Sequence, residues 1–231
     1  MTEAAVVSFD LDETLWAFMP MMDGSLRAAI AALEERHPAV AGRISVERLH
    51  DERRRMADER DGTYLELRLE SFRRVLAAHD LHDPDLPAWM VDAWMAARPE
   101  TVRLHDDVEP ELDALVASGR VLGAITNGNF PFAELAVARR FAFIVHAEQI
   151  GEMKPAAAPF RHAVDLCGGD PARWVHVGDG LDTDIAGAQA VGMKAVWINR
   201  AGVPLPEGYS PDAELPSLAG LDALVTDLLG E

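Results

Sequence analysis

Apolar residues gather in short continuous runs along most of the chain, and turn-forming residues bound each run. Short runs of this kind predict strands that are covered on both faces, as in a parallel sheet. Helical patterns lie between the runs, with Pro131 in a first helical turn and Gly192 at a helix C-terminus. This alternation is typical of an α/β fold built on a doubly wound parallel sheet. The predicted strands are Val6–Phe9, Val121–Ile125, Phe143–Val145, Trp174–Val177 and Ala195–Ile198.

The region from residue 16 to residue 99 has helical patterns only. Its apolar residues recur at spacings of three and four. This predicts a helical insertion that follows the first strand and lies above the C-terminal end of that strand. We therefore expect a core of residues 1–15 and 100–231 and an inserted domain of residues 16–99. The clearest helical patterns are Leu26/Ile30/Leu33 and Leu65/Leu69/Phe72/Leu76.

The formal net charge of the chain is −18 at pH 7. A surface this acidic repels nucleic-acid phosphates and anionic lipids, so we expect neither nucleic acid nor a membrane as a partner. The charge is uneven, because residues 16–99 contain 12 arginines and 15 acidic residues, while the remainder carries a net −15. The run Arg53-Arg54-Arg55 lies among acidic residues and indicates a solvated helix face. The same acidic surface would repel a small anionic substrate. A phosphate site in this chain would therefore need its own local positive charge.

The remaining segments bear on compartment and on the C-terminal end. Cys167 is the only cysteine, which excludes an intramolecular disulfide, and we interpret it as a small buried hydrophobe. The N-terminal sequence MTEAAVVSFD has no basic stretch, and its apolar run is too short for a signal peptide or membrane span. We expect a cytoplasmic protein. The Pro-rich segment Val203–Pro216 predicts a loop, and Leu218–Leu229 predicts a final amphipathic helix.

Polar residues follow three of the predicted strands directly. The first strand runs into Asp10 and Asp12, the second into Thr126 and Asn127, and the strand Trp174–Val177 into the segment Gly178–Asp184. In an open α/β sheet, ligands bind beyond the carboxyl ends of the strands. Turn or helix-cap roles would explain any one of these acids alone. Their recurrence at three strand ends favours a common site at one edge of the sheet.

The chemistry of phosphate monoester hydrolysis accounts for these residue types. The uncatalysed reaction is among the slowest known, so several effects must lower the barrier together. A carboxylate nucleophile divides the displacement into two steps, and Mg²⁺ neutralises the charge that keeps carboxylate and phosphate apart. Asp10 and Asp179 suit the cation, and Asp12 can protonate the leaving alkoxide and then activate water. Thr126 and Asn127 offer hydroxyl and backbone N–H donors to the phosphoryl oxygens.

Lysine is rare in this chain, which has only Lys154 and Lys194 among its 21 basic residues. Lys154 lies in Gly151–Pro155, just beyond the third predicted strand, where a loop would reach the same sheet edge. Its compact ammonium can balance the charges of the nucleophile and the phosphate together. Lys194 precedes the last predicted strand and is interpreted as an ordinary surface residue.

Together, these segments resemble the four sequence motifs of the haloacid dehalogenase superfamily. The resemblance covers essentially the whole chain and implies a Rossmann-like core with a helical cap inserted after the first motif. It implies that Asp10 is the nucleophile, that Asp12 is the general acid and base, and that Thr126 and Lys154 bind the phosphate. The matching residues, in the order of the family, are Asp10-Leu11-Asp12-Glu13-Thr14, Thr126-Asn127, Lys154-Pro155 and Gly178-Asp179 with Asp184.

The same resemblance implies a magnesium ion held by Asp10, Asp179 and the backbone carbonyl of Asp12. Asp184 would orient Lys154 or a magnesium-bound water rather than react. Within the superfamily, the cap and the run 125–129 are most similar to the bacterial flavin-mononucleotide (FMN) phosphatases, a group also associated with the phosphorylated ribityl-aminouracil intermediate of riboflavin synthesis. We therefore expect a small-molecule phosphate monoester as the substrate, with FMN or a related ribityl phosphate as a candidate.

Two positions depart from the family pattern or lie outside it. The family usually carries Asp-Pro after the lysine motif, whereas Ala156-Ala157 follow it here, which removes a helix cap without touching the catalysis. Asp182 matches no shared position, and we expect it to cap a helix N-terminus.

Trp16, Phe18 and Met19 follow the first motif and either line the mouth of the pocket or pack the cap against the core.

Three alternative functions share this sequence pattern. A 2-haloacid dehalogenase uses the same fold and nucleophile without a metal, but it does not normally carry an acid where Asp12 stands, so Asp12 and Asp179 argue against it. A phosphomutase would need the cap to hold a sugar phosphate and exclude water, which the sequence does not specify. A phosphate-binding module without turnover would gain nothing from Asp12. The sequence leaves the natural substrate and the oligomeric state open.

Overall fold

The computed structural model describes residues 5–59 and 63–231. The chain forms two compact units, which are described separately. The core unit consists of Met1–Phe18 and Arg103–Glu231, and the helical unit consists of Met19–Val102. The sequence predicted boundaries at residues 16 and 99. Trp16 and Phe18 thus belong to the core unit.

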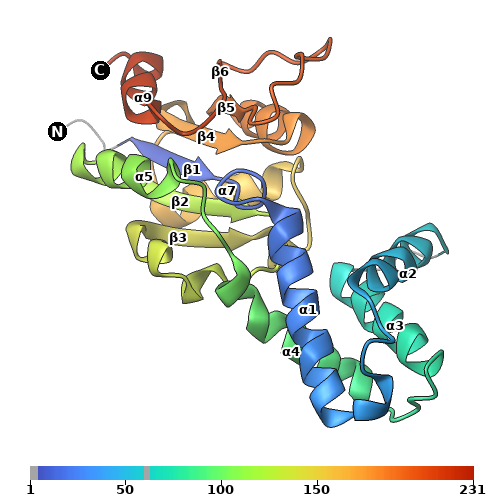
Figure 1. Cartoon of the computed structure of the whole chain (residues 1–231). Helices are drawn as coiled ribbons and strands as arrows, with labels where there is room; N and C mark the ends of the chain where they lie inside the picture. The colour runs from blue at the N-terminus through green and yellow to red at the C-terminus, as the bar shows by residue number, and fades with distance from the viewer. Residues whose placement is uncertain (1–4, 60–62) are drawn as a thin grey trace. The chain divides into compact units, whose positions relative to one another are not determined.

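The core unit is built on a six-stranded sheet in which every neighbouring pair of strands is parallel, with the order β3-β2-β1-β4-β5-β6 (Figure 1). This confirms the predicted α/β fold with a doubly wound parallel sheet. The chain builds the sheet outward from β1 to one side, and then returns to the other side of β1 with β4. Such a switch point opens a crevice at the carboxyl ends of the strands. The strands are β1 (Val6–Phe9), β2 (Val121–Thr126), β3 (Phe141–His146), β4 (Trp174–Gly178), β5 (Lys194–Ile198) and β6 (Ala213–Leu215).

Helices flank this sheet and complete its core. Helix α5 packs on β2 and against α9, and α7 packs on β2 and β3 and against α8. Every residue of β1 and β4 is buried, as expected of central parallel strands covered on both faces. The helices are α5 (Val108–Ala117), α6 (Ala147–Ile150), α7 (Ala157–Cys167), α8 (Gly187–Gln189) and α9 (Leu221–Leu229), with 3₁₀ turns η2 (Phe132–Glu134), η3 (Ala136–Arg140) and η4 (Pro171–Arg173) and a π-helical turn η5 (Leu181–Ala186).

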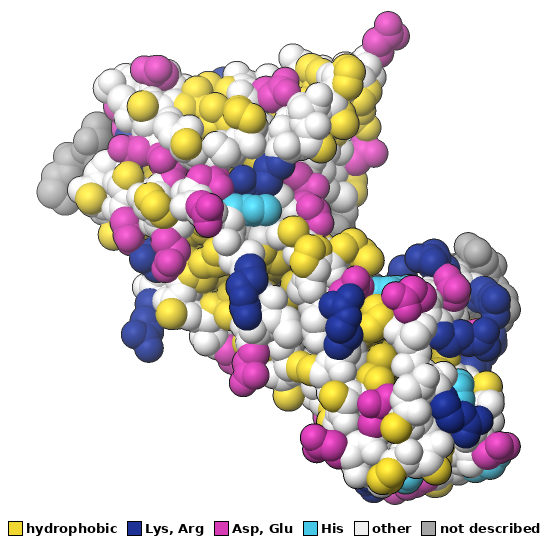
Figure 2. Space-filling model, in the orientation of Figure 1, with side chains coloured by type: hydrophobic (Ala, Val, Ile, Leu, Met, Phe, Trp, Pro, Cys, Tyr) yellow, Lys and Arg dark blue, Asp and Glu magenta, His cyan; other side chains and the backbone are white. Residues whose placement is uncertain are grey.

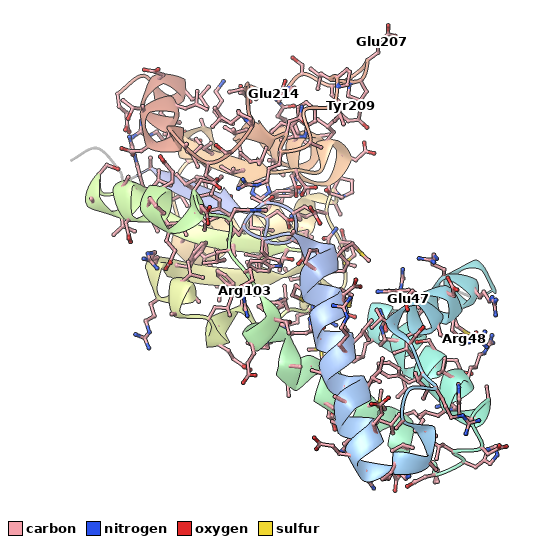
Figure 3. The ribbon with its side chains drawn as sticks, in the orientation of Figure 1. Glu47, Arg48, Arg103, Glu207, Tyr209 and Glu214 are labelled. Carbon is pink, nitrogen blue, oxygen red and sulfur yellow. The ribbon has the colours of Figure 1, made fainter. Side chains whose placement is uncertain are left out.

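Strand β6 lies inside the segment that the sequence predicted as a loop, so that prediction is wrong for Ala213–Leu215. The strand is only three residues long, and its Pro-rich surroundings hide it. It pairs with β5 in parallel, and the side-chain amide of Asn199 also donates to the carboxylate of Glu214 at 2.6 Å. Glu214 is labelled in Figure 3. The final helix begins at Leu221 rather than at residue 218.

Four predicted helix ends can be compared with the structure. Pro131 precedes the 3₁₀ turn η2, and no α-helix lies between β2 and β3 in the described chain, so its predicted place in a first α-helical turn is wrong. Gly192 has a φ of +89° and closes the turn after α8, as predicted. Ala156 precedes α7 without a side-chain cap, in line with the missing Asp-Pro. Asp182 is not an N-cap: it lies within η5 and accepts a hydrogen bond from the Tyr209 hydroxyl at 2.6 Å (Figure 3).

The helical unit contains α1 (Phe18–Arg36), the 3₁₀ turn η1 (Pro38–Val40), α2 (Val46–Glu59), α3 (Tyr64–Ala77) and α4 (Leu86–Thr101). Leu26, Ile30 and Leu33 are buried along α1, as predicted, but Leu65 on α3 is 40% exposed, so its predicted place on the apolar face is wrong. On α2, Arg54 pairs with Asp51 and Arg55 with Glu52. Basic and acidic side chains accordingly intermix on this unit in Figure 2.

Two further findings concern membrane-spanning helices and the single cysteine. No helix within residues 5–59 and 63–231 combines the length and the apolar character that a bilayer crossing requires. Cys167 is a free thiol that packs against the apolar core cluster but is only partly buried, so its interpretation as a small buried hydrophobe is confirmed in part. Partial burial raises the pKa of this thiol.

Candidate active site

A pocket of about 320 Å³ lies within the core unit, where β1, β2 and β4 end. All seven residues that the sequence assigned to the site line this pocket. Four of them stand at strand ends or directly after them, and they converge because parallel strands bring their carboxyl ends to one edge of the sheet. These four are Asp10, Thr126, Asn127 and Asp179. The lining residues are Asp10, Asp12, Glu13, Phe18, Thr126, Asn127, Gly128, Lys154, Asp179, Gly180, Thr183 and Asp184.

Asp10 lies at the centre of the sheet edge. Its backbone N–H donates to the carbonyl of Val177 at 2.9 Å, so the parallel pairing of β1 with β4 continues to this residue. Asp179 follows the end of β4, and Thr126 is the last residue of β2. Switch-point geometry thus places the predicted nucleophile between its predicted partners.

Asn127 holds the Lys154 loop in place. Its side-chain amide donates to the Lys154 carbonyl at 3.0 Å, and its side-chain oxygen accepts from the Lys154 N–H at 2.7 Å. This paired contact fixes the backbone of a lysine that is 27 residues away in sequence. The side chain of Asn127 therefore binds protein, and the predicted substrate-binding role stays with its backbone N–H.

The Lys154 ammonium is buried, with a side-chain exposure of 1%, and all three of its N–H groups are used. They donate to Asp10 Oδ1 at 2.8 Å, to Asp184 Oδ1 at 2.5 Å and to the Ile125 carbonyl at 2.6 Å. Burial acts to lower the pKa of Lys154, but the charges of Asp10 and Asp184 outweigh it and raise the pKa. The lysine is therefore a fixed positive charge.

The Lys154 ammonium contacts the carboxylates of both Asp10 and Asp184, and the pKa values of these two groups shift in opposite directions. Burial opposes ionisation of Asp184, yet Lys154 and His176 outweigh it and hold the pKa of Asp184 well below its usual range. Burial raises the pKa of Asp10 to about 8, with Asp184 adding to the effect. Burial and Asp184 also raise the pKa of Asp179 to about 6. The site thus has an excess of acid groups over cations.

A divalent cation fits this excess. One carboxylate oxygen from each of Asp10, Asp179 and Asp184 lies within 4.8 Å of the others. Carboxylate oxygens are the ligands that Mg²⁺ prefers, and a cation there would remove the repulsion that raises two of the pKa values. The predicted ligand set contained Asp10, Asp12 and Asp179. The carboxylates that the structure groups are Asp10, Asp179 and Asp184, while Asp12 was expected to contribute its backbone carbonyl.

Asp12 is held from the core side of the pocket. Its Oδ1 accepts a hydrogen bond from Trp16 Nε1 at 2.9 Å. Trp16 is fully buried and packs against Phe130, with ring centroids 5.0 Å apart, so it does not line the pocket mouth. Phe18 does line the pocket, and Met19 in the helical unit is 47% exposed. Phe18 thus takes the first of the two predicted roles, while Trp16 takes neither, because it packs within the core unit.

Two glycines make room for the acids. A Cβ on Gly178 would lie 2.4 Å from Cγ of Asp184, so only glycine lets that carboxylate approach β4. A Cβ on Gly128 would lie 3.1 Å from Oδ2 of Asp12. These glycines stand inside the predicted motifs, but the sequence analysis gave them no role.

Arg200 supports the loop after β1, a contact that no sequence motif indicated. Its guanidinium donates to the Thr14 carbonyl at 3.0 Å and makes a bidentate pair with Asp107 at 3.0 and 2.8 Å. Asp107 also accepts from the backbone N–H of Leu218 at 2.6 Å. Lys194, the first residue of β5, pairs with Asp212 and is 43% exposed, in agreement with its interpretation as a surface residue.

Comparisons with known proteins give a consistent result. Residues 4–192 match the family model of the haloacid dehalogenase-like hydrolases. N-acylneuraminate-9-phosphatase of Rattus norvegicus is 36% identical over 142 residues, a match that spans 58% of this chain and only 57% of the relative. The 5-amino-6-(5-phospho-D-ribitylamino)uracil phosphatase of Escherichia coli is 26% identical over 96% of both chains. A crystal structure of a 2-haloacid dehalogenase from Pseudomonas syringae is 33% identical, covers 97% of this chain and 99% of its own, and has a TM-score of 0.80.

Proposed function

The chain belongs to the haloacid dehalogenase-like hydrolases, and from this premise we propose that it is a magnesium-dependent phosphatase of small phosphate monoesters that works through a phosphorylated Asp10. The observation that carries the proposal is the buried cluster in which Lys154 is shared by Asp10 and Asp184, with Asp179 beside them. This cluster combines a nucleophile, a fixed cation and a cation-binding set at the switch point of the sheet.

Asp10 is the proposed nucleophile. Lys154 donates to its Oδ1, so Oδ2 is the oxygen that attacks phosphorus. The phosphorus–oxygen bond to the leaving group breaks as the bond to Asp10 forms, which gives an acyl-phosphate and an alcohol. Magnesium, when bound, neutralises the charge between the phosphate and the carboxylates. Asp10, Asp179 and the backbone carbonyl of Asp12 are its proposed ligands.

The proton and the phosphoryl oxygens need their own partners. Asp12 is proposed to protonate the leaving oxygen and then to remove a proton from the water that hydrolyses the acyl-phosphate. The hydrogen bond from Trp16 holds that carboxyl group in one orientation. Thr126 Oγ1 already accepts from the Gly128 N–H at 2.9 Å, so its hydroxyl proton can be donated to a phosphoryl oxygen. The backbone N–H of Asn127 is proposed to do the same. The Lys154 ammonium is proposed to balance the charge of the phosphate while its N–H groups stay on protein oxygens, and Asp184 is proposed to orient it.

For the substrate we propose a ribityl phosphate or a related small phosphate ester. The relative from Escherichia coli, matched over 96% of both chains, is named for such a substrate. Selection among phosphate esters is proposed to lie with the helical unit, which acts as the cap. A cytoplasmic location remains a prediction from the N-terminal sequence, and the absence of nucleic-acid or membrane partners remains a prediction from the acidic composition.

A dehalogenase is the second candidate, because a structure named as a 2-haloacid dehalogenase is 33% identical to this chain. In that reaction the leaving group is a halide, which needs neither a proton nor a metal. The presence of Asp12 and the excess of acid groups around Asp179 would then have no purpose. A phosphomutase stays an alternative within the phosphoryl-transfer class, and product analysis in the assay below separates it from a phosphatase.

The test is a panel of phosphate esters that includes FMN, ribityl phosphates and sugar phosphates, with a 2-haloalkanoate as comparison. Each is assayed for phosphate or halide release with magnesium and with chelator. We expect phosphate release that chelator abolishes and magnesium restores. Full phosphatase activity in chelator would contradict the metal assignment, and metal-independent halide release alone would favour the dehalogenase.

A further inference from the structure

A polar pair lies behind the pocket, between the two central strands. Ser8 on β1 and His176 on β4 are register partners in the sheet, and both are fully buried. Nδ1 of His176 lies 2.9 Å from Oγ of Ser8. The ring of Phe160 on α7 meets the imidazole edge-on, with centroids 5.2 Å apart, in an otherwise apolar cluster. Polar side chains cost free energy in such surroundings unless they are hydrogen-bonded, so this pair calls for an explanation.

The other ring nitrogen of the histidine faces the catalytic cluster. Nε2 of His176 lies 3.5 Å from Oδ1 of Asp184, the same oxygen that accepts from Lys154. Oδ2 of Asp184 accepts the backbone N–H of Gly180 at 2.9 Å. Three donors from three different segments thus surround one carboxylate.

The acceptors determine the direction of this hydrogen-bond chain. Both oxygens of Asp184 already accept hydrogen bonds, Oδ1 from Lys154 and Oδ2 from Gly180, so Asp184 is an acceptor toward His176 as well, and the hydrogen lies on Nε2 of His176. His176 is fully buried against Phe160, where a charged imidazolium is disfavoured, so the imidazole is neutral and its Nδ1 is an acceptor. The Ser8 hydroxyl must therefore donate to Nδ1. The chain runs from Ser8 to His176 to Asp184, where it meets Lys154 from the other side.

On the basis of the proposed phosphatase function, we infer that His176 is a positioning residue that sets how Lys154 is shared between Asp184 and Asp10. The ammonium lies 2.5 Å from Asp184 and 2.8 Å from Asp10. The hydrogen bond from His176 withdraws negative charge from Asp184 Oδ1. Without that bond, Asp184 attracts the ammonium more strongly, and Asp10 loses cationic support as it approaches the phosphate. Ser8 keeps the imidazole in the tautomer that makes this possible.

The first test is an NMR measurement, which needs no enzymatic activity. It is simple to interpret because the chain has only two lysines. Their side-chain nitrogen signals can be followed by NMR, with Lys194→Arg assigning each of them. His176→Phe should shift the Lys154 signal and leave the Lys194 signal in place. In the wild-type protein, the nitrogen spectrum of His176 should report a neutral ring with hydrogen on Nε2. An unmoved Lys154 signal, hydrogen on Nδ1 or a doubly protonated ring would each overturn the inference.

The second test separates hydrogen bonding from packing. His176→Phe keeps the ring against Phe160 but loses the donor, and His176→Gln keeps a donor but loses the ring. Phe160→Leu is the matched control, since it disturbs the packing of the imidazole without removing a polar group. We expect His176→Phe to lower kcat roughly tenfold with KM nearly unchanged, the low end for a hydrogen bond to a charged group. His176→Gln should recover most of that loss, and Phe160→Leu should lower Tm while kcat stays at the wild-type value.

An equal loss of kcat in Phe160→Leu and His176→Phe would overturn the inference, because packing alone would then explain the effect. Loss of kcat in His176→Gln equal to that in His176→Phe would overturn it as well. If the wild-type protein hydrolyses no phosphate ester, the proposed function fails, and the NMR measurements still decide the arrangement of His176. If His176→Phe does not fold, the wild-type tautomer and the Lys154 signal of His176→Gln, expected near its wild-type position, decide it.

Discussion

The two lysines of this chain form ion pairs of equal length in very different surroundings. Lys154 lies 2.8 Å from Asp10 with a side-chain exposure of 1%, and Lys194 lies 2.8 Å from Asp212 with a side-chain exposure of 43%. The inner lysine also contacts a second carboxylate and a backbone carbonyl. The outer pair stands at the start of β5 in contact with solvent. Distance alone would rank the two pairs as equals.

Burial makes the difference between them. Breaking a buried pair leaves an uncompensated charge and costs about 3–5 kcal/mol, whereas an exposed pair contributes about 0–1 kcal/mol. The inner pair is thus not a device for stability alone, because an apolar replacement of both partners would serve that purpose at least as well. Its value lies in holding charge beside the predicted nucleophile.

The largest contrast is expected between Asp10→Asn and Asp212→Asn. The amide of Asp10→Asn is a far poorer nucleophile, so turnover should fall by on the order of 10⁶-fold, as for other removed nucleophiles. Asp212→Asn should leave kcat/KM within about twofold of wild type, because it alters an exposed pair. Steady-state kinetics with one phosphate ester checks both variants, and circular dichroism checks that both are folded. Substantial turnover by Asp10→Asn would break the comparison.

The next contrast is between the lysines themselves. Lys154→Ala removes an oriented charge at the phosphate and should lower kcat/KM by roughly 10²-fold or more. It should also lower Tm, since Asp10 and Asp184 stay behind in a buried site. Lys194→Ala should change neither quantity much. Equal and small effects of the two substitutions would mean that burial does not give Lys154 a special role.

Asp12 and Asp10 can be compared within the pocket, because Asp12 is held by Trp16 and Asp10 by Lys154. A proton from Asp12 matters only for a poor leaving group. Asp12→Asn should therefore slow phospho-enzyme formation from an alkyl phosphate about 10²-fold more than from p-nitrophenyl phosphate. Single-turnover kinetics measures this step directly, while steady-state rates would mix it with the hydrolysis that Asp12 also assists. The same loss with both substrates would contradict an acid–base role.

The smallest expected effect is on how stability depends on pH, and it has opposite signs at Asp10 and at Asp212. Burial raises the pKa of Asp10 to about 8. The folded, metal-free protein therefore binds more protons here than the unfolded chain between about pH 4 and pH 8, and stability should fall as pH rises through that window. Burial opposes the shift at Asp212, but the Lys194 and Ala195 hydrogen bonds lower its pKa. Its contribution is present above the unfolded pKa and is lost as pH falls through the folded value.

The measurement is Tm in chelator across this pH range for wild type, Asp10→Asn and Asp212→Asn. The decline of Tm with rising pH should be weaker in Asp10→Asn than in wild type. Asp212→Asn should keep that decline and differ from wild type only at the acidic end. Parallel curves for wild type and Asp10→Asn would contradict the raised pKa.

The sequence predicted the arrangement of the sheet and the residues that meet at its edge. Asp10, Thr126 and Asp179 could be found because strand ends are local features and parallel strands bring them to one place. The rarity of lysine and its place in a loop at the same sheet edge pointed to Lys154, and the family resemblance, confirmed by the match over residues 4–192, added Asp184. The roles of these residues stay predictions.

The supporting contacts could not be predicted in the same way. Ser8 and His176 are polar residues inside apolar runs, but their contact joins positions 168 residues apart. Arg200 reaches Thr14 across 186 residues. Asn127 was expected to offer its backbone N–H to the substrate, and nothing in the sequence indicated that its side chain holds the Lys154 loop. A spacing pattern carries no information about which long-range neighbour a side chain meets, so such contacts require the fold.

The most direct test of the central claim is to trap the phosphorylated form of Asp10. Asp12→Asn is mixed with p-nitrophenyl phosphate and magnesium, quenched in acid within the first turnover, and digested for peptide mass spectrometry. The account predicts one phosphoryl group on Asp10, which is absent when chelator replaces magnesium. Turnover with no covalent intermediate, or a phosphoryl group on any other residue, would contradict it.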